Sequence, residues 1–302
     1  MTAATSSEDW KEVAAAQNPV ETIGEQDETF YRHICGDMSK LTPWENKHLA
    51  GLEAFWKESG LSGNPLTGMK SQFSKFEKPL TLRALQGAKW DYSKTTQQLK
   101  EYKAWRDSEE GNATYDQVKE ILSTGICYWH GRDKACRPLL MINLEKAPQV
   151  DVNGIDILRM PVFLLDYAIN NCLLPGKVEQ WCVLVECSQC SVWDGPTYIR
   201  FFSTIIPVLQ TRYKGRLSRM YVIGLPYMLH SCAEFGRKCC DERTAAKVRF
   251  VDNVEGVFAL LEEDIRKEQL EERFGGHCAD VSIFKEEPQY AIFPDGPITE
   301  QQ

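Results

Sequence analysis

Two cysteines, Cys187 and Cys190, form the arrangement in this sequence that most directly suggests chemistry. A Cys-x-x-Cys pair can exchange a disulfide when it opens a helix after a strand, or it can supply half of a zinc site. The redox role requires a thioredoxin-like order of elements, and this chain has a different order. A zinc site requires a second pair, for which residues 239–240 and 277–278 are the distant candidates. We therefore expect Cys187 and Cys190 to be packing residues, and we keep a redox or metal protein as an alternative.

The motifs of several catalytic classes are absent from the sequence. It contains no G-x-S-x-G elbow, no P-loop, no G-x-G-x-x-G turn and no H-E-x-x-H motif. The five histidines stand apart from one another, and no pair of carboxylates is singled out for acid–base work. We therefore expect a protein without catalytic activity, cofactor or bound metal ion.

The charge of the chain is unevenly distributed. A formal net charge of -8 argues against general affinity for nucleic acid. Basic residues nevertheless gather in one region, namely Arg200, Arg212, Lys214, Arg216, Arg219, Arg237, Lys238, Arg243, Lys247 and Arg249. An acidic protein with one basic region predicts a localised anion site, and a solvated helix face is the plainer interpretation.

Length and composition are those of a soluble globular protein. The chain of 302 residues can bury a large core, and its 43% hydrophobic and 26% charged content is ordinary. No run approaches the ~18 consecutive apolar residues that would span a membrane. The acidic N-terminus lacks the features of a signal or transit peptide, so the eleven cysteines are expected to remain thiols. These observations predict a cytoplasmic protein.

The elements that must position any site are clearest between residues 181 and 250. Residues 181–187 and 219–225 are short apolar runs, typical of strands that are buried on both faces. Between them apolar residues recur at helical spacing, namely Tyr198, Phe201, Phe202, Ile205, Ile206 and Leu209. A strand, a helix and a second strand predict a parallel unit with a right-handed crossover and a covering layer on each face.

Changes in the residue pattern along the chain predict where it divides into domains. The first forty residues lack periodicity, whereas a capping box at Thr42 and Glu45, with Pro43 between them, opens a helical region. We expect a flexible acidic tail at 1–40, a helical N-terminal subdomain at 41–112, a main domain at 113–280 and a C-terminal strap or tail at 281–302.

Within the main domain the pattern predicts a hairpin over residues 126–144 and a helix over 155–173. A further helix is expected from Val257, ending at Gly275 and Gly276. Helices, hairpin and alternating strands and helices together predict an α/β fold.

In this order the segments resemble the CRAL-TRIO lipid-binding family, in particular its phosphatidylinositol and phosphatidylcholine transfer proteins. The resemblance covers residues 41 to 280 and is carried by LTPWENKHLAGLEAF, LRALQGAKWDYSKTTQQLKEYKAWR, GRDKACRPLL, RYKGRLSRMYVIGLP and ERFGGHCAD. It implies a helical N-terminal subdomain followed by a mixed sheet of about five strands with flanking helices. It also implies a deep apolar cavity behind a mobile gate helix.

The resemblance further implies positions that would contact a lipid headgroup. Lys89 and Lys247 match two lysines that contact the inositol phosphate in phosphatidylinositol binders, and Asp133 matches the aspartate of the hairpin. Gly215 stands where those proteins have a glutamate, which leaves Arg216 alone of that pair. The remaining cations favour a more anionic phosphoinositide, through charge-assisted hydrogen bonds. The predicted headgroup residues are Lys89, Asp133, Arg216, Arg243 and Lys247.

The apolar positions of the family are also matched, with changes. Residues 227–240 align without gaps to the gate helix. Trp181 and Val183 replace hydroxyl residues, and Trp129 and Leu140 replace tyrosines, so phosphatidylcholine is disfavoured. The predicted cavity residues are Trp129, Leu140, Trp181, Val183, Val185 and Phe202. The predicted gate residues are Tyr227, Met228, Leu229, Cys232, Phe235 and Cys239.

We therefore expect a non-catalytic protein that binds a phosphoinositide-type lipid and transfers it between membranes or presents it to an enzyme. Each buried methylene contributes ~0.8 kcal/mol, so an acyl chain can supply much of the affinity. The expected partners are a phospholipid or other hydrophobic small molecule, a transient membrane surface, and a lipid kinase or regulatory protein. The alternatives are a terpenoid or tocopherol-like ligand, or a regulatory adaptor whose cavity is closed by Trp129 and Trp181.

Overall fold

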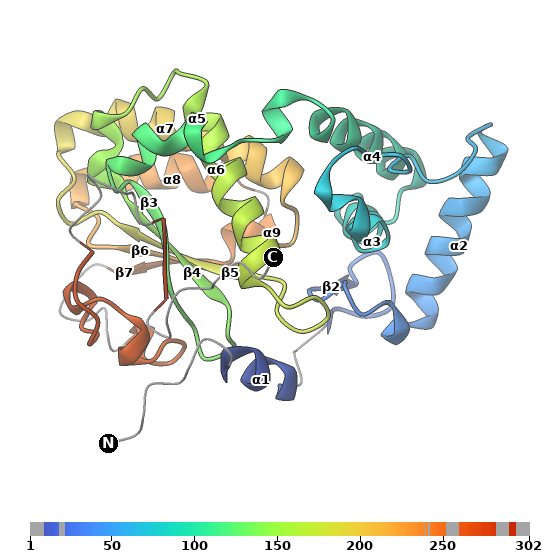
Figure 1. Ribbon diagram of the computed structural model, residues 1–302, viewed down its shortest axis with the longest axis horizontal. Helices are drawn as coiled ribbons and strands as arrows, with labels where there is room; N and C mark the ends of the chain where they lie inside the picture. The colour runs from blue at the N-terminus through green and yellow to red at the C-terminus, as the bar shows by residue number, and fades with distance from the viewer. Residues whose placement is uncertain are drawn as a thin grey trace.

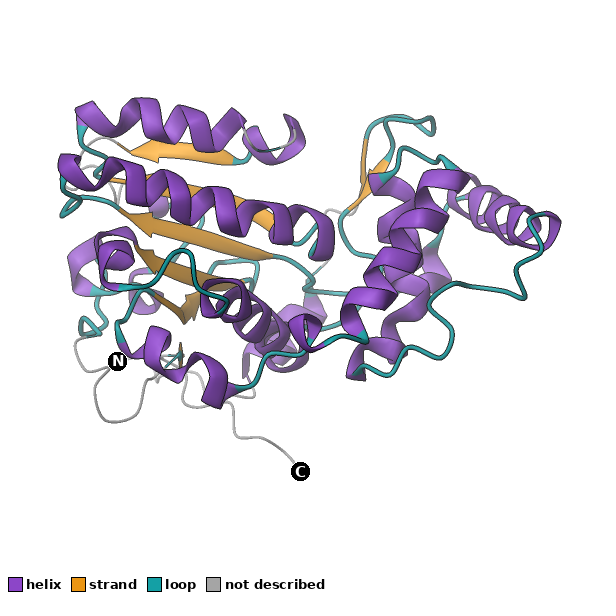
Figure 2. Ribbon diagram, turned by 90° about the horizontal axis from the view of Figure 1, so that it is seen from above, coloured by secondary structure: helices purple, strands orange, loops and turns teal. Residues whose placement is uncertain are grey.

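The computed structural model describes residues 9–17, 22–238, 240, 242–251, 260–281 and 290–293. It has an α/β body and a lobe of helices beside it (Figures 1 and 2). None of the helices in these described ranges is long and apolar enough to cross a membrane.

In the described part of the chain a six-stranded sheet forms the centre of the α/β body. Its strands are β3 (Cys127–Arg132), β4 (Pro138–Asn143), β5 (Trp181–Glu186), β6 (Leu217–Ile223), β7 (Val248–Val251) and β8 (Ala291–Ile292), in the order β7-β6-β5-β4-β3-β8. Strands β4 to β7 are parallel, β3 is antiparallel to β4, and β8 is parallel to β3. The sheet is therefore mixed, as expected, with six strands in place of about five.

One face of this sheet is covered by helices. They are α5 (Tyr115–Ser123), α6 (Asp156–Tyr167), α7 (Gly195–Arg212) and α8 (His230–Lys238). The short α9 (Glu242–Ala245) follows α8 in the chain and buries none of its residues. The crossovers from β4 to β7 all step in one direction along the sheet, so right-handed connections place their helices on the same side. Figure 1 shows α5 to α8 together on that side of the strands. The parallel unit expected around α7 is confirmed by the pairing of β5 with β6.

The opposite face is covered by the segment of residues 260–281. Leu261, Ile265, Leu270 and Phe274 from this segment are buried against the sheet. The expected helix from Val257 begins outside the described residues, and its expected continuation to Gly275 is wrong. Residues Lys267–Gln269 and Glu272–Phe274 form separate 3₁₀ turns instead, the second ending at the left-handed Gly275. Of the predicted C-terminal strap, β8 is described and pairs with β3.

The helical lobe contains α2 (Pro43–Glu58), α3 (Glu77–Gly87) and α4 (Tyr92–Arg106). The capping box is confirmed: the Thr42 hydroxyl accepts from the Glu45 N–H at 3.2 Å, and the Glu45 carboxylate accepts from the Thr42 N–H at 2.7 Å. Asp91 caps α4 through the N–H of Lys94. These caps fix the helix starts, and Leu52, Leu82, Leu85 and Leu99 fill the space between the helices.

The N-terminal region corrects the expectation of a flexible tail. Helix α1 (Asp9–Ala16) and the short strands β1 (Thr22–Ile23) and β2 (Tyr31–Arg32) belong to the folded molecule. Trp10 and Ala14, one helical turn apart, are both buried, and the Arg132 guanidinium lies 3.5 Å from the centroid of the Trp10 ring. Phe30 and Cys35 are also buried. Small and acidic residues between these few apolar ones concealed this packing in the sequence.

Candidate functional site

The face of the sheet that lies towards the helices is apolar across its whole width. Residues paired across neighbouring strands lie on one face of a sheet. One such row runs through Trp129, Leu140, Val183, Met220 and Val248, and the next through Cys127, Ile142, Val185, Val222 and Phe250. Every side chain in both rows is apolar or aromatic. Such a face must be covered either by the protein or by a ligand.

The covering of this face is incomplete over its middle strands. Leu140 and Ile142 of β4, and Met220 and Val222 of β6, are only partly buried although they lie in the interior rows of the sheet. At the edge, Phe250 of β7 is 37% exposed. Accessible apolar surface thus extends from β4 towards β7, on the side where α7 and α8 lie (Figure 1).

The predicted cavity residues all belong to one hydrophobic cluster on this face. Trp129, Trp181, Val183 and Val185 are buried in it, and Leu140 and Phe202 are partly buried against it. Of the six, the accessible surface belongs to Leu140 and Phe202. Sequence reasoning missed Ile142, Met220 and Val222, although strict alternation along each strand was the signal that could have identified them.

The two tryptophans pack tightly at the β3 side of the face. Their ring centroids lie 6.0 Å apart in an edge-to-face arrangement, and the Trp129 indole N–H donates to the Leu164 carbonyl at 2.9 Å. Both indoles are therefore part of the core. This packing moves the accessible part of the face away from β3 and towards β6.

The segment predicted as a gate follows the carboxyl end of β6. It begins with a 3₁₀ turn, Tyr227–Leu229, and continues as α8. Leu229 is buried, whereas Tyr227 is 87% exposed and Met228 is 72% exposed. The side chains of Cys232 and Phe235, and Cys239 as a whole, lie outside the described residues. The start of the segment therefore presents two large, largely apolar side chains to solvent.

The predicted headgroup residues occupy different environments. Lys89 is exposed on the turn before α4. Asp133 is buried and accepts hydrogen bonds from the N–H groups of Ala135 and Arg137 and from the Arg137 guanidinium at 2.6 Å. Asp133 thus closes the hairpin turn. Arg216 is also buried, and its guanidinium donates to the Glu179 carbonyl at 2.8 Å.

Arg243 and Lys247 both lie near the N-terminal segment. The Arg243 guanidinium lies 4.8 Å from the centroid of the Tyr31 ring, and the Lys247 ammonium donates to the Leu217 carbonyl. Burial first, and then the charges of Lys247, Arg83, Arg137 and Arg243, lower the pKa of His33 to about 4. These cations therefore converge on His33, at the amino ends of the parallel strands. Sequence reasoning missed His33 because the segment that carries it was interpreted as a tail.

Tyr31 also accounts for the glycine at position 215. A Cβ atom at Gly215, whose φ is +70°, would lie 2.2 Å from the Tyr31 hydroxyl oxygen. A larger residue there would displace the N-terminal segment. Tyr31 thus fills the space beside Gly215.

A buried charge cluster lies where the helical lobe meets the α/β body. The carboxylate of Glu179 forms a short ion pair with Arg83 and lies 3.9 Å from Arg216. It also accepts from the backbone N–H groups of Cys35 at 3.0 Å and Gly36 at 2.5 Å. Burial alone would raise the pKa of Glu179, but Arg83 and Arg216 hold it below the ordinary value. This cluster fastens the N-terminal segment to both parts of the molecule.

The cysteine pair that opened the sequence analysis is buried. Cys187 and Cys190 are free thiols, and the Cys190 N–H donates to the Cys187 carbonyl at 2.9 Å. Their mutual hydrogen bond and burial raise the pKa of the Cys187 thiol. Among the residues that the structure describes, no three His, Cys, Asp or Glu side chains are placed to hold a metal ion.

Known proteins resemble this chain in sequence and in fold. A family model for the CRAL/TRIO domain matches residues 122–276. The CRAL-TRIO domain-containing protein C23B6.04c of Schizosaccharomyces pombe is 29% identical over 196 residues, which are 65% of this chain and 18% of that protein. This chain therefore spans less than a fifth of the length of that relative. The crystal structure of Sfh5 is similar with a TM-score of 0.60 and 16% identity, covering 82% of this chain and 91% of the other, which is a likeness of fold.

Proposed function

This chain belongs to the CRAL/TRIO domain family, and from that premise we propose that it binds a lipid or another hydrophobic small molecule and carries it chemically unchanged. The observation that carries this proposal is the apolar sheet face beneath α7 and α8. There Leu140, Ile142, Met220 and Val222 keep accessible surface within the interior rows. An apolar ligand laid over them would complete the covering of the sheet.

The energy available on such a face is sufficient for a carrier. Transfer of apolar surface from water is worth about 25 cal/mol per Å², or ~0.8 kcal/mol per methylene. Ten methylenes of an acyl chain would therefore contribute roughly 8 kcal/mol before the costs of ordering are subtracted. Because the gain is non-directional, the same face suits a phospholipid, a terpenoid or a tocopherol-like ligand.

The start of the gate segment supports a transient contact with a membrane surface. Tyr227 and Met228 are exposed side by side immediately after the carboxyl end of β6. An aromatic ring with a polar tip and a flexible thioether suit the boundary between headgroups and acyl chains. We propose that these two side chains enter that boundary when a lipid is exchanged.

The cations around His33 support a phosphorylated headgroup as the finer assignment. Arg243 and Lys247 are the predicted headgroup residues whose charges act on His33, and Lys89 is exposed on its turn. A phosphate placed among them would form charge-assisted hydrogen bonds. Of the predicted set, we therefore retain Lys89, Arg243 and Lys247 for this role, because Asp133 is held by the hydrogen bonds that close its hairpin turn.

Lipid extraction from the purified chain, followed by mass spectrometry, tests the proposal. The chain is first incubated with phosphatidylcholine vesicles that contain phosphatidylinositol or a phosphatidylinositol monophosphate. We expect lipid to be acquired, and Lys247→Ala to weaken pickup of the phosphorylated lipid by ~1.5–3 kcal/mol. Lys100→Ala, on the exposed side of α4, is the matched control. A chain that acquires no lipid or terpenoid would overturn the carrier function, and unaltered pickup by Lys247→Ala would overturn the headgroup assignment alone.

The buried pair of Trp129 and Trp181 favours a second candidate, a regulatory adaptor of the same fold. In that case the indoles close the face, and the protein acts through a stable protein partner. The same lipid-extraction experiment distinguishes the carrier from the adaptor. An adaptor acquires no lipid, whereas it still binds its protein partner.

A further inference from the structure

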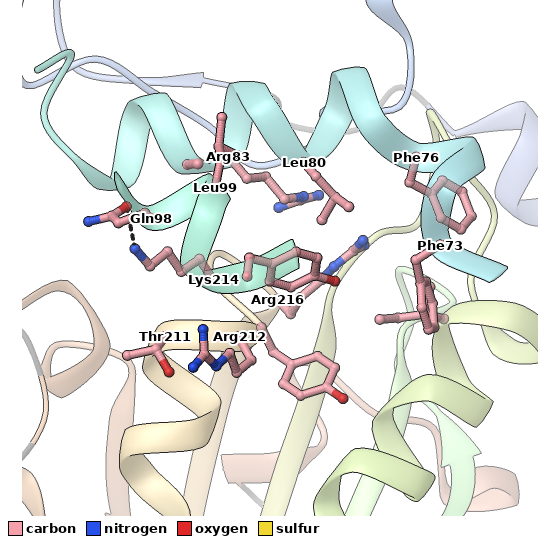
Figure 3. Close-up of a pocket in the computed structure, with 14 residues that line it drawn as sticks. Phe73, Phe76, Leu80, Arg83, Gln98, Leu99, Thr211, Arg212, Lys214 and Arg216 are labelled. Atoms are coloured by element: carbon pink, nitrogen blue, oxygen red, sulfur yellow. Dashed lines mark hydrogen bonds between the residues drawn. The ribbon is translucent and has the colours of Figure 1, made fainter. Parts of the chain in front are cut away.

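A pocket lies between the helical lobe and the α/β body, away from the apolar sheet face. The space within it, open solvent included, is about 580 Å³. Helices α3 and α4 form one wall, and the end of α7 with the loop into β6 forms the other (Figure 3). Lys89, Arg243 and Lys247 are not among the described residues that line it. The pocket adjoins the headgroup position proposed above through Arg83, whose guanidinium lines the pocket and donates to the His33 carbonyl at 3.2 Å.

The lining of this pocket is strongly cationic. Arg83, Arg212, Lys214 and Arg216 all contribute to it, and no Asp or Glu is found among its described lining residues. Figure 3 shows Arg83 reaching in from the helical lobe and Arg216 from the α/β body. Like charges held together in a partly enclosed space repel one another unless an anion lies between them.

The two buried arginines of the pocket lie near too little negative charge to balance both of them. Arg83 is 3% exposed and Arg216 is 8% exposed, and both turn to the single carboxylate of Glu179. Glu179 pairs closely with Arg83, whereas its carboxylate lies 3.9 Å from Arg216. Burial first, and then the charge of Arg83, lower the pKa of Arg216 to about 10. Of the two buried arginines in the pocket lining, Arg216 is therefore the one that lies farther from the shared carboxylate.

A second observation points to a missing partner. The Nε atom of Arg83 is buried and has no hydrogen-bond partner in the described part of the chain. Leaving a buried donor of a charged group unsatisfied is costly, so such atoms usually face a ligand or a water. Arg83 lines the pocket, and an acceptor bound there would be close to its guanidinium.

The outer part of the pocket provides cations that can meet a ligand from solvent. Arg212 is partly exposed at the end of α7, with its guanidinium 5.2 Å from the centroid of the Trp105 ring. The Lys214 ammonium donates to the Gln98 side-chain oxygen at 2.6 Å, a bond drawn in Figure 3. Both side chains are less buried than Arg216.

We propose that this pocket binds a phosphate group, either as free phosphate or as the phosphomonoester of a soluble or lipid-borne headgroup. A phosphate carries nearly two negative charges and strong acceptor oxygens, and guanidinium groups bind such oxygens in paired hydrogen bonds. The ligand would balance Arg216 from within and Arg212 and Lys214 from outside. Because the pocket joins α3 and α4 to the α/β body, its occupation would stabilise the contact between the two parts. This inference does not depend on lipid binding at the sheet.

Calorimetric titration of the full chain with inorganic phosphate, against sodium chloride at matched ionic strength, tests the proposal. The site variant is Arg212→Gln/Lys214→Gln. The control is Lys94→Gln/Lys100→Gln, which removes the same charge from the exposed side of α4. We expect saturable binding by the wild type and the control, and binding at least tenfold weaker in the site variant. Circular dichroism and Tm establish that all three chains are folded.

A second arm separates the sources of the phosphate. Phosphatidylcholine vesicles with and without a phosphatidylinositol monophosphate are sedimented with each chain. Binding of free phosphate, lost in the site variant, assigns the pocket to soluble phosphates, whereas vesicle binding alone, lost in the same variant, assigns it to a lipid headgroup. No binding in either arm, or equal loss in the control, overturns the proposal. Lipid pickup at the sheet is measured in parallel and is expected to stay unchanged in the site variant. Failure of the phosphate proposal is thereby distinguished from failure of the carrier proposal.

Discussion

The two faces of the central sheet are built from the same strands and differ in how completely they are covered. Leu139, Met141, Leu184 and Ile223 point to one face and are all fully buried, whereas Leu140, Ile142, Met220 and Val222 on the other face are partly buried. Adjacent residues of one strand thus meet different surroundings. The comparison teaches that apolar strands do not by themselves define a closed core, because the covering segment decides whether space for a ligand remains.

Hydrogen bonds as well as apolar packing hold residues 260–281 on the closed face. The Tyr128 hydroxyl donates to Glu271 at 2.6 Å, and the Lys134 N–H donates to the Asp264 carbonyl at 2.7 Å. Arg219 and Tyr221 form short hydrogen bonds to the Asp264 carboxylate. Residues 260–281 are therefore fastened to the strands along their length. The open face ends instead at the turn where Tyr227 and Met228 are exposed.

The largest effect is expected from a cavity on the closed face. Leu184 is fully buried there, so Leu184→Ala should lower the free energy of unfolding by about 2–5 kcal/mol. Urea unfolding followed by circular dichroism measures this loss. Met220→Ala on the open face should cost less, because Met220 is only partly buried. Equal losses for the two variants would mean that both faces are closed.

A smaller effect is expected when each face receives a larger side chain. Leu184→Phe should cost about 1–3 kcal/mol because the closed face has no room for extra atoms. Val222→Phe should cost about 1 kcal/mol or less, since the new ring can occupy accessible space. The same Val222→Phe chain should acquire less lipid from vesicles. If the two substitutions cost the same and pickup is unchanged, the open face is not the ligand site.

The smallest effect is expected at the amino edge of the open face, where His33 lies among cations. Its folded pKa of about 4 is below the ordinary 6.5, so folding favours the neutral ring. The resulting stability is complete above pH 6.5 and is lost as the pH falls from 6.5 towards 4. His33→Gln should therefore show a smaller loss of Tm over this window than the wild type. Identical Tm profiles would show that His33 does not titrate in this range.

Much of the fold could be predicted from local patterns. The capping box of Thr42 and Glu45, the hairpin and the unit around α7 were correct, because caps, turns and apolar spacing act over a few residues. The predictions of a flexible tail at 1–40 and of a helix that continues to Gly275 were wrong. The burial of Trp10 and Phe30 depends on surfaces formed by distant segments. Leu261 to Phe274 carry helical spacing, yet they follow the surface of the sheet in short turns.

The candidate sites also combine features predicted from the sequence with features that only the structure revealed. The cavity residues on β4 and β5 followed from resemblance, but the exposure of Ile142, Met220 and Val222 depends on how α7 and α8 lie above them. The cationic pocket was not predicted, since Arg83 belongs to the helical lobe and Arg216 to the loop before β6. Nothing in either segment indicates that they share the carboxylate of Glu179.

The sequence by itself determined the family, the order of helices and strands, and the presence of a basic region in an acidic chain, because these properties reside in residue types and short spacings. Tertiary structure alone decided which face of the sheet stays accessible, that Tyr31 fills the space beside Gly215, and that Arg83, Arg212, Lys214 and Arg216 line one pocket. The physical reason is that burial and charge balance depend on every group nearby in space. Such groups come from segments that lie far apart along the chain.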